Sequence, residues 1–149
     1  MESEDEQQKI SETSPSVQTH LAILQAVIER MAGNSNSCKT WCITIVSSIL
    51  VVVAEESKPD YALLALLPTF LFISLDAYYL GLEKAFRNSY NSFVKKLHHS
   101  KITAEDLFSV SPVGSVTKLQ FAASKSFSIW GFYLFLIALI ILSRVFVLK

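Results

Sequence analysis

Asp76 is the residue whose type and setting most suggest chemistry. It is the one charged residue in the apolar segment 61–82. An acid inside a membrane is by default a functional candidate, as part of an ion pathway, a proton relay or an interhelical pair. If hydrocarbon covers the whole segment, Asp76 lies six residues from its inner end, about 9 Å deep. Hydroxyl donors, Tyr133 among them, are then expected at the same depth. The candidate pore-lining or interhelix polar residues are Thr44, Ser47, Ser48 and Asp76.

The position of the membrane boundary decides between two interpretations of Asp76. Tyr61 and the pair Tyr78-Tyr79 could form the two aromatic belts, roughly 26 Å apart along a helix. Asp76 would then be interfacial and would orient helices instead of carrying ions. We favour this interpretation because the first apolar segment of the chain is short. The intramembrane alternative stays open.

The other chemically distinctive residues indicate no catalysis. Cys38 and Cys42, the only cysteines, lie on one face of a helix with no histidine near them in sequence. Two sulfurs make at most half of a metal site, so we expect small buried thiols. His98 and His99 are adjacent, would point apart and suit a basic surface. With no nucleophile–base pair, glycine-rich phosphate loop or paired carboxylates, we expect no catalytic, cofactor or metal site and no enzyme.

Composition indicates which class of protein must position these residues. Among 149 residues, 13 Lys and Arg balance 13 Asp and Glu, which argues against nucleic acid as a partner. Only 17% of residues are charged, 51% are hydrophobic and the mean hydropathy is +0.39, whereas a soluble domain has about 25% charged residues. We therefore predict an all-α integral membrane protein with the lipid bilayer as its surroundings.

Three apolar segments are long enough to be candidate transmembrane helices. Thr40–Ala54 has no charge but is short beside the ~20 residues that cross a bilayer, so we expect a thin crossing with Lys39 reaching the interface. Tyr61–Leu82 follows after a connection that suits a tight antiparallel hairpin. Phe127–Leu148 contains one charge, Arg144, near its end, where it is tolerable.

Charge distribution predicts the orientation of these segments. Three crossings place the two termini on opposite sides of the membrane. The N-terminal segment and residues 83–126 hold ten of the thirteen basic residues. By the positive-inside rule we expect a cytoplasmic N-terminus and an external C-terminus in a bacterial inner membrane.

Two amphipathic stripes indicate a helical layer under the membrane. Residues 16–32 carry apolar side chains at a mean spacing of 3.5 residues, and Gly33–Ser37 is predicted to end that helix. The second span is expected to continue as one helix over 61–98, kinked at Pro68. We expect the stripes to pack together, within or between subunits. The cytoplasmic interaction face comprises Leu21, Leu24, Ile28, Phe86, Tyr90, Phe93 and Leu97.

The connector to the last span carries its own signals. Thr103 and Asp106 have the spacing of a helix cap and an acid three residues later, which predicts a short helix. Ser115 is expected to cap a helix that runs directly into the third span. Pairs of small residues four apart allow close helix packing, and these are Ala77 with Gly81 and Ser124 with Ser128.

The run from Leu75 to Arg87, LDAYYLGLEKAFR, with Asn88-Ser89-Tyr90 after it, resembles the end of the membrane hairpin in SLATT-type proteins. These are small prokaryotic membrane proteins associated with anti-phage defence. The resemblance covers roughly residues 16–100, and the third span departs from the two-span pattern. It implies an oligomeric membrane effector that damages membrane integrity when a cytoplasmic sensor protein signals infection, and it brings no catalytic residues.

The sequence therefore predicts an oligomeric membrane effector, a homo-oligomer that perturbs the membrane or forms a pore. A non-conducting scaffold that anchors a cytoplasmic partner is the alternative. The expected organisation is a disordered acidic tail (1–15), an amphipathic cytoplasmic helix (16–32), a transmembrane hairpin whose second helix extends into the cytoplasm (38–98), cytoplasmic connector helices (99–125) and a third transmembrane helix (126–149).

Overall fold

The computed structural model describes residues 12–56, 58–107 and 109–147, and these form helices with no strand among them. Residues 1–11 of the expected acidic tail lie outside the described part of the chain. Four α-helices run in the order α1 (Pro15–Glu55), α2 (Leu66–His98), α3 (Val116–Ser124) and α4 (Phe127–Leu142). Short 3₁₀ helices at Pro59–Ala65 and Ala104–Leu107 and a π-helical turn at Ser143–Val147 connect or extend them. The predicted all-α class is confirmed.

Helix α1 is one continuous helix of 41 residues, about 62 Å long. The prediction that Gly33–Ser37 ends a first helix is wrong. A glycine in a helix interior costs only about 1 kcal/mol, and packing along α2 continues through this segment because Ser35 and Cys38 are buried. The buried face follows the 3.6-residue repeat of a straight α-helix and consists of Val17, His20, Leu24, Met31, Ser35, Cys38, Cys42, Val46 and Val53.

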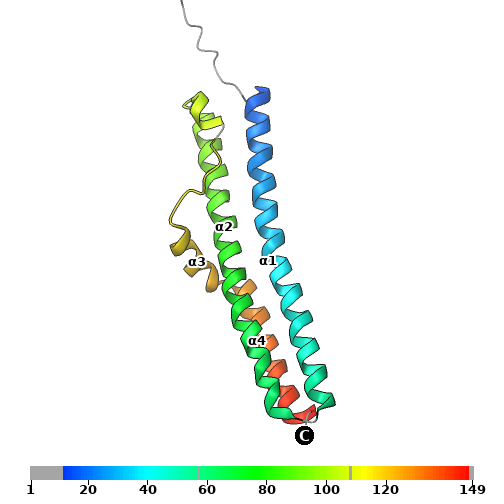
Figure 1. The fold of residues 1–149 in the computed structure, drawn as a ribbon. Helices are drawn as coiled ribbons and strands as arrows, with labels where there is room; N and C mark the ends of the chain where they lie inside the picture. The colour runs from blue at the N-terminus through cyan, green and yellow to red at the C-terminus, as the bar shows by residue number, and fades with distance from the viewer. Residues whose placement is uncertain (1–11, 57, 108, 148–149) are drawn as a thin grey trace, which may run out of the picture.

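Helix α2 runs antiparallel to α1, so that the two form a long hairpin (Figure 1). The prediction of a single helix over 61–98 is wrong at its start, because Pro59–Ala65 is a 3₁₀ helix and α2 begins at Leu66. Pro68 is therefore the third residue of α2. Proline is tolerated in the first turn of a helix, so Pro68 removes no hydrogen bond from the interior of α2 and the reason for the predicted kink does not apply. The predicted short helix after Thr103 is present at Ala104–Leu107.

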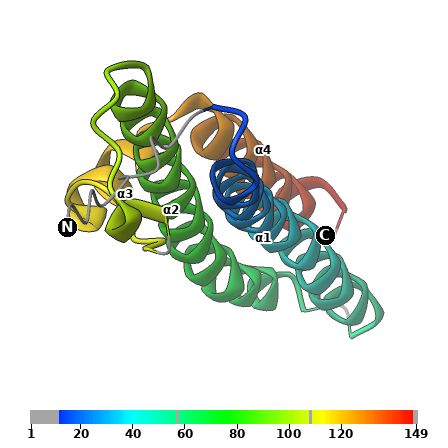
Figure 2. The same ribbon diagram turned by 90° about the horizontal axis from the view of Figure 1, so that it is seen from above.

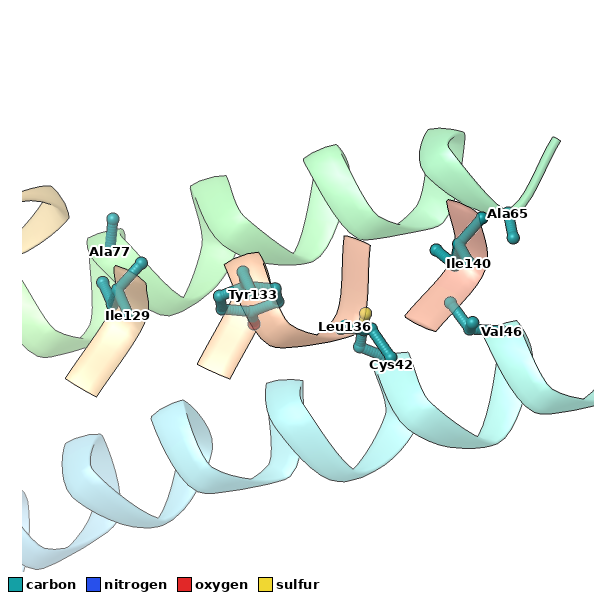
Figure 3. Packing of buried hydrophobic residues seen from close by; sticks show 8 residues of the cluster. All are labelled: Cys42, Val46, Ala65, Ala77, Ile129, Tyr133, Leu136 and Ile140. Atoms are coloured by element: carbon teal, nitrogen blue, oxygen red, sulfur yellow. The ribbon is translucent and has the colours of Figure 1, made fainter. Parts of the chain in front are cut away.

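Helix α4 lies beside the half of the hairpin that contains the turn, as Figure 1 and the view from above in Figure 2 show. Its buried side chains fill the space between the two arms of the hairpin (Figure 3). The Tyr133 hydroxyl donates to the Phe72 carbonyl oxygen at 3.2 Å, which ties α4 to α2. This cluster comprises Cys42, Val46, Ala65, Ala77, Ile129, Tyr133, Leu136 and Ile140.

A second cluster lies in the part of the hairpin that α4 does not reach, which we call the extension (residues 15–34 and 82–98). Val17 and Leu24 of α1 pack there against Phe93 of α2 and Leu107 of the connector. The expected packing of the two amphipathic stripes is thus present within one chain. It buries the apolar face of each helix without a second subunit.

Helix α3 is separate from α4, so the predicted direct run into the third span is wrong. Lys125 and Ser126 form a turn between the two helices. Gly81 of α2 explains where α3 lies: a Cβ at this position would be 2.8 Å from the backbone N and Cα of Gln120. The two backbones approach this closely only because Gly81 has no side chain, and α3 is held against α2 instead of continuing along the axis of α4.

Three helical stretches are long and apolar enough to span a membrane: Pro15–Glu55, Pro59–His98 and Phe127–Val145. Large apolar side chains cover their outer surface, and the exposed fraction reaches 70% for Leu67 and 89% for Phe127. Water would penalise such a surface, whereas lipid would not. The start of α1 and the end of α4 lie at opposite ends of the molecule (Figure 1), as an odd number of crossings requires.

Candidate functional site

The buried carboxylate of Asp76 forms the centre of a polar cluster between α1 and α2. The Asp76 side chain is fully buried, and its Oδ2 lies 2.6 Å from the Nζ of Lys39. The Ser35 hydroxyl donates to Asp76 Oδ1, and Lys39 Nζ is 3.5 Å from the Ser35 Oγ. Both partners come from α1, one helical turn apart, so α1 presents a cation and a hydroxyl to one acid of α2. We call these three residues the Asp76 cluster.

The level of the Asp76 cluster along the bundle follows from its neighbours. Ala77, the next residue, packs beside Ile129 (Figure 3), and Ile129 is the third residue of α4. If α4 spans the hydrocarbon, the cluster lies close to the boundary at which α4 begins. This geometry agrees with the interfacial interpretation. The 17% exposed Lys39 side chain turns inward to Asp76 instead of reaching towards headgroups as expected.

Tyr133 of α4 interacts with Asp76 as expected, whereas the predicted polar residues of α1 are not near it. Thr44, Ser47 and Ser48 are exposed on the outer surface of α1. The Thr44 hydroxyl donates to the carbonyl of Thr40 at 2.9 Å, and that of Ser48 donates to the carbonyl of Thr44 at 2.8 Å. The expectation that these hydroxyls share the depth and surroundings of Asp76 is wrong, because Asp76 is opposite Ser35, more than two turns away along α1.

Sequence reasoning missed Ser35 and Lys39 as partners of Asp76, although a signal was present. Lys39 lies sixteen residues before Glu55, and Asp76 lies sixteen residues after Asp60. In an antiparallel hairpin, residues equidistant from the turn face each other. Lys39 was instead expected to reach the membrane interface, and the helix end wrongly placed at Gly33–Ser37 put Ser35 in a connection.

The small residues have roles within the chain. Ala77 and Gly81 are buried and face α4 and α3, so they are not available to a second subunit. Ser124 donates to the Phe121 carbonyl at 2.8 Å, and Ser128 is exposed in the next helix. The helix break between Ser124 and Ser128 means that they do not form one packing face, contrary to expectation.

Most residues of the predicted interaction face pack inside the chain. Leu21, Leu24, Tyr90, Phe93 and Leu97 belong to the cluster inside the extension. The remaining members, Ile28 and Phe86, are half-buried. An open groove of about 440 Å³ lies between α1 and α2 of the extension and is lined by Gln25, Ile28, Glu29, Arg87, Tyr90 and Asn91.

The connector is clamped to α2 by two polar contacts. Ser89 donates to the Ser111 carbonyl at 2.7 Å and accepts from the Val113 N–H at 3.0 Å. Lys96 Nζ lies 2.8 Å from Asp106 Oδ1. Hydrogen bonding from Lys96, with a further bond from a backbone N–H, holds the pKa of Asp106 below its usual value. These contacts attach Asp106, Ser111 and Val113 of the connector to the extension.

Two further ion pairs and the two thiols lie elsewhere in the structure. Arg144 pairs with Asp60 at 2.6 Å, which links the π-helical turn after α4 to the 3₁₀ helix of the hairpin turn. The expected pair of Arg87 with Glu83 is present at 2.8 Å. Cys38 and Cys42 are free and buried, as predicted. Within the described ranges, no group of His, Cys, Asp and Glu has the arrangement of a metal site.

Comparison with known proteins finds no matching family model, no matching curated protein and no matching solved structure.

Proposed function

We propose that the protein is an oligomeric membrane effector in which the exposed face of α1 forms the contact between subunits or the wall of a pore. The observation that carries this proposal is the polar row on that face. Thr44, Ser47 and Ser48 are exposed in a stretch where Trp41, 61% exposed, and Val52, 57% exposed, would contact lipid.

The polar row is unfavourable in pure hydrocarbon. Burying a hydroxyl without a hydrogen bond costs about 1–3 kcal/mol by mutational data. Thr44 and Ser48 satisfy their donors on the α1 backbone, whereas Ser47 has no hydrogen-bond partner among the described residues. A second copy of α1, or water in a pore, would supply that partner.

The residues proposed here for the contact or pore wall differ from those expected from the sequence. Asp76 is inside the subunit, where it orients α1 and α2, so it is not part of the proposed pore wall. The small residues and the amphipathic stripes also pack within one chain, which leaves the α1 face for association. The role in anti-phage defence, with a cytoplasmic sensor as trigger, rests on the resemblance of residues 75–90 to SLATT-type proteins.

Disulfide cross-linking in membranes tests the association. In a background with Cys38→Ala and Cys42→Ala, Ser47→Cys should form cross-linked dimers on oxidation. Leu67→Cys, also exposed but on the outer face of α2, is the matched control and should stay monomeric. Cross-linking at both positions or at neither would contradict an interface on the α1 face.

Release of a trapped dye from vesicles tests the pore. The wild-type protein should release the dye, and Ser47→Leu with Thr44→Val should reduce the rate several-fold because the hydroxyls that favour water are removed. Ile45→Val changes an apolar residue on α1 and should leave the rate unchanged. Intact vesicles with the wild type, or equal release by all variants, would contradict the pore.

The alternative proposal, a non-conducting scaffold, is favoured by the groove on the extension. This groove combines the apolar Ile28 and Tyr90 with the charged Glu29 and Arg87, a mixture typical of surfaces that bind protein segments. A scaffold predicts that a cytoplasmic protein co-purifies with the wild type and is lost on Ile28→Glu, with no dye release by either form.

A further inference from the structure

An apolar cavity of about 240 Å³ lies where α2, α3 and α4 meet. Its walls include Ile73 of α2, Phe121 of α3 and the α4 residues Trp130, Leu134 and Ile137. None of its lining residues belongs to the Asp76 cluster or to the polar row of α1. It opens beside the turn at which α3 ends and the third apolar helix begins.

The mouth of the cavity carries a positive charge. Lys125, in the turn between α3 and α4, lines the cavity, and its Nζ lies 4.5 Å from the centroid of the Phe121 ring. Among the described residues Lys125 has no acidic partner, unlike Lys39, Lys58 and Lys96. The first turn of α4 follows directly, and its partial positive charge also favours an anion.

The surroundings of the mouth are those of a membrane interface. Phe121 and Trp130 are 65% and 52% exposed, and aromatic side chains gather at headgroup level in membrane proteins. A ligand that fits has one apolar end for the cavity and one negative group for Lys125. An engineered cavity of about 150 Å³ binds benzene, so about 240 Å³ is room for part of one acyl chain and not for a folded protein segment.

We propose that this cavity binds an anionic phospholipid, with part of one acyl chain against Trp130, Leu134 and Ile137 and the phosphate of the headgroup against Lys125. The bound lipid would wedge α3 against α4 at the interface. The site does not depend on the proposed oligomer or pore.

Fluorescence quenching by brominated lipids tests the proposal, because the chain has only two tryptophans. With Trp41→Phe, the full-length protein reports from Trp130 alone. It is reconstituted into phosphatidylcholine vesicles that contain the same fraction of either brominated phosphatidylglycerol or brominated phosphatidylcholine. The anionic lipid should quench Trp130 more, with an apparent preference of at least about threefold.

Variants connect this preference to the cavity. Lys125→Gln should abolish the preference for the anionic lipid, whereas Lys118→Gln, an exposed lysine of α3 that does not line the cavity, should keep it. Ile73→Phe should fill the cavity and reduce quenching of Trp130 by both lipids. A protein with Trp130→Phe that reports from Trp41 should show no such preference.

Several results would overturn the proposal. Equal quenching of Trp130 by both lipids would show that Lys125 selects no headgroup. Full quenching after Ile73→Phe would show that Trp130 contacts only surrounding lipid. No quenching by either lipid would show that protein, for example a second copy of the chain, covers the cavity.

Discussion

Breaking the Asp76 cluster should destabilise the protein by an amount that depends on which partner is removed. Lys39→Met leaves the fully buried Asp76 carboxylate with Ser35 as its remaining partner. Removing one partner of a buried ion pair costs about 3–5 kcal/mol. Asp76→Asn keeps an acceptor for Ser35 and leaves a lysine whose chain is already 17% exposed and can extend to the interface. We expect it to cost about 1–2 kcal/mol.

A double-mutant cycle measures the interaction itself. In the Asp76→Asn background, Lys39→Met removes no buried pair, so the coupling energy should be about 2–4 kcal/mol. The assay is reversible unfolding in mixed detergent micelles, followed by circular dichroism. Lys58→Met is the matched control, because Lys58 is 56% exposed and 3.9 Å from its partner; it should cost less than about 0.5 kcal/mol.

Two results of this cycle would refute the role of the Asp76 cluster. A coupling energy below about 0.5 kcal/mol would mean that the pair contributes no more than a surface ion pair. A larger loss of unfolding free energy for Asp76→Asn than for Lys39→Met would mean that an unpaired Lys39 costs more than an unpaired Asp76, and that Asp76 is well solvated. Either result would remove the Asp76 cluster as the contact that sets the register of the hairpin.

Further predictions concern the packing of α3 and the clamp on the connector. Gly81→Ala should cost about 1–3 kcal/mol in the same unfolding assay, because the new Cβ would be 2.8 Å from the Gln120 backbone. Gly33→Ala meets no atom within 4 Å and should stabilise α1 by about 1 kcal/mol, so equal effects of the two changes would contradict this packing. Asp106→Asn should cost less than about 1 kcal/mol at pH 7. Because Lys96 lowers the pKa of Asp106, the stabilisation is complete above about pH 4 and is lost as the pH falls through the lowered pKa. Urea-gradient unfolding of wild type and Asp106→Asn at pH 7 and pH 2 would contradict this if the difference between them grew at low pH.

The sequence predicted the elements that depend on long apolar runs and on periodicity. The packing of Leu24 against Phe93 follows from two stripes of helical spacing that have no other apolar surface to cover. The pair of Glu83 with Arg87 follows from their separation of four residues. The short helix after Thr103 follows from the local hydrogen bond that Asp106 accepts from the Thr103 N–H at 3.1 Å.

Predictions failed where tertiary contacts outweigh local preference. Gly33 and Ser37 are typical of a helix end, but the packing of Ser35 and Cys38 against α2 keeps α1 continuous. The break after Ser124 has the opposite cause, because Gly81 holds α3 against α2 and away from the axis of α4. No local pattern encodes either result.

Predicting the Asp76 cluster required the correct alignment of α1 with α2. Asp76 stood out in the sequence because it is a lone acid in an apolar segment, but its partners depend on how the hairpin aligns. Lys39 and Asp76 are equally far from the turn, and Ser35 joins them because α1 runs through Gly33–Ser37 without a break. The lipid cavity had no sequence signal, because Ile73, Lys125 and Trp130 come together only through the crossing of three helices.

The proposals above require that α2 crosses the membrane, so that the hairpin turn and the connector lie on opposite sides of it. The most direct test labels single cysteines in whole cells with a reagent that cannot cross membranes, in the Cys38→Ala, Cys42→Ala background. Glu56→Cys at the hairpin turn and Glu105→Cys in the connector are both exposed positions. One should be labelled in intact cells and the other only after the membrane is opened. Labelling of both under the same condition, or recovery of the protein in the soluble fraction, would contradict this crossing by α2.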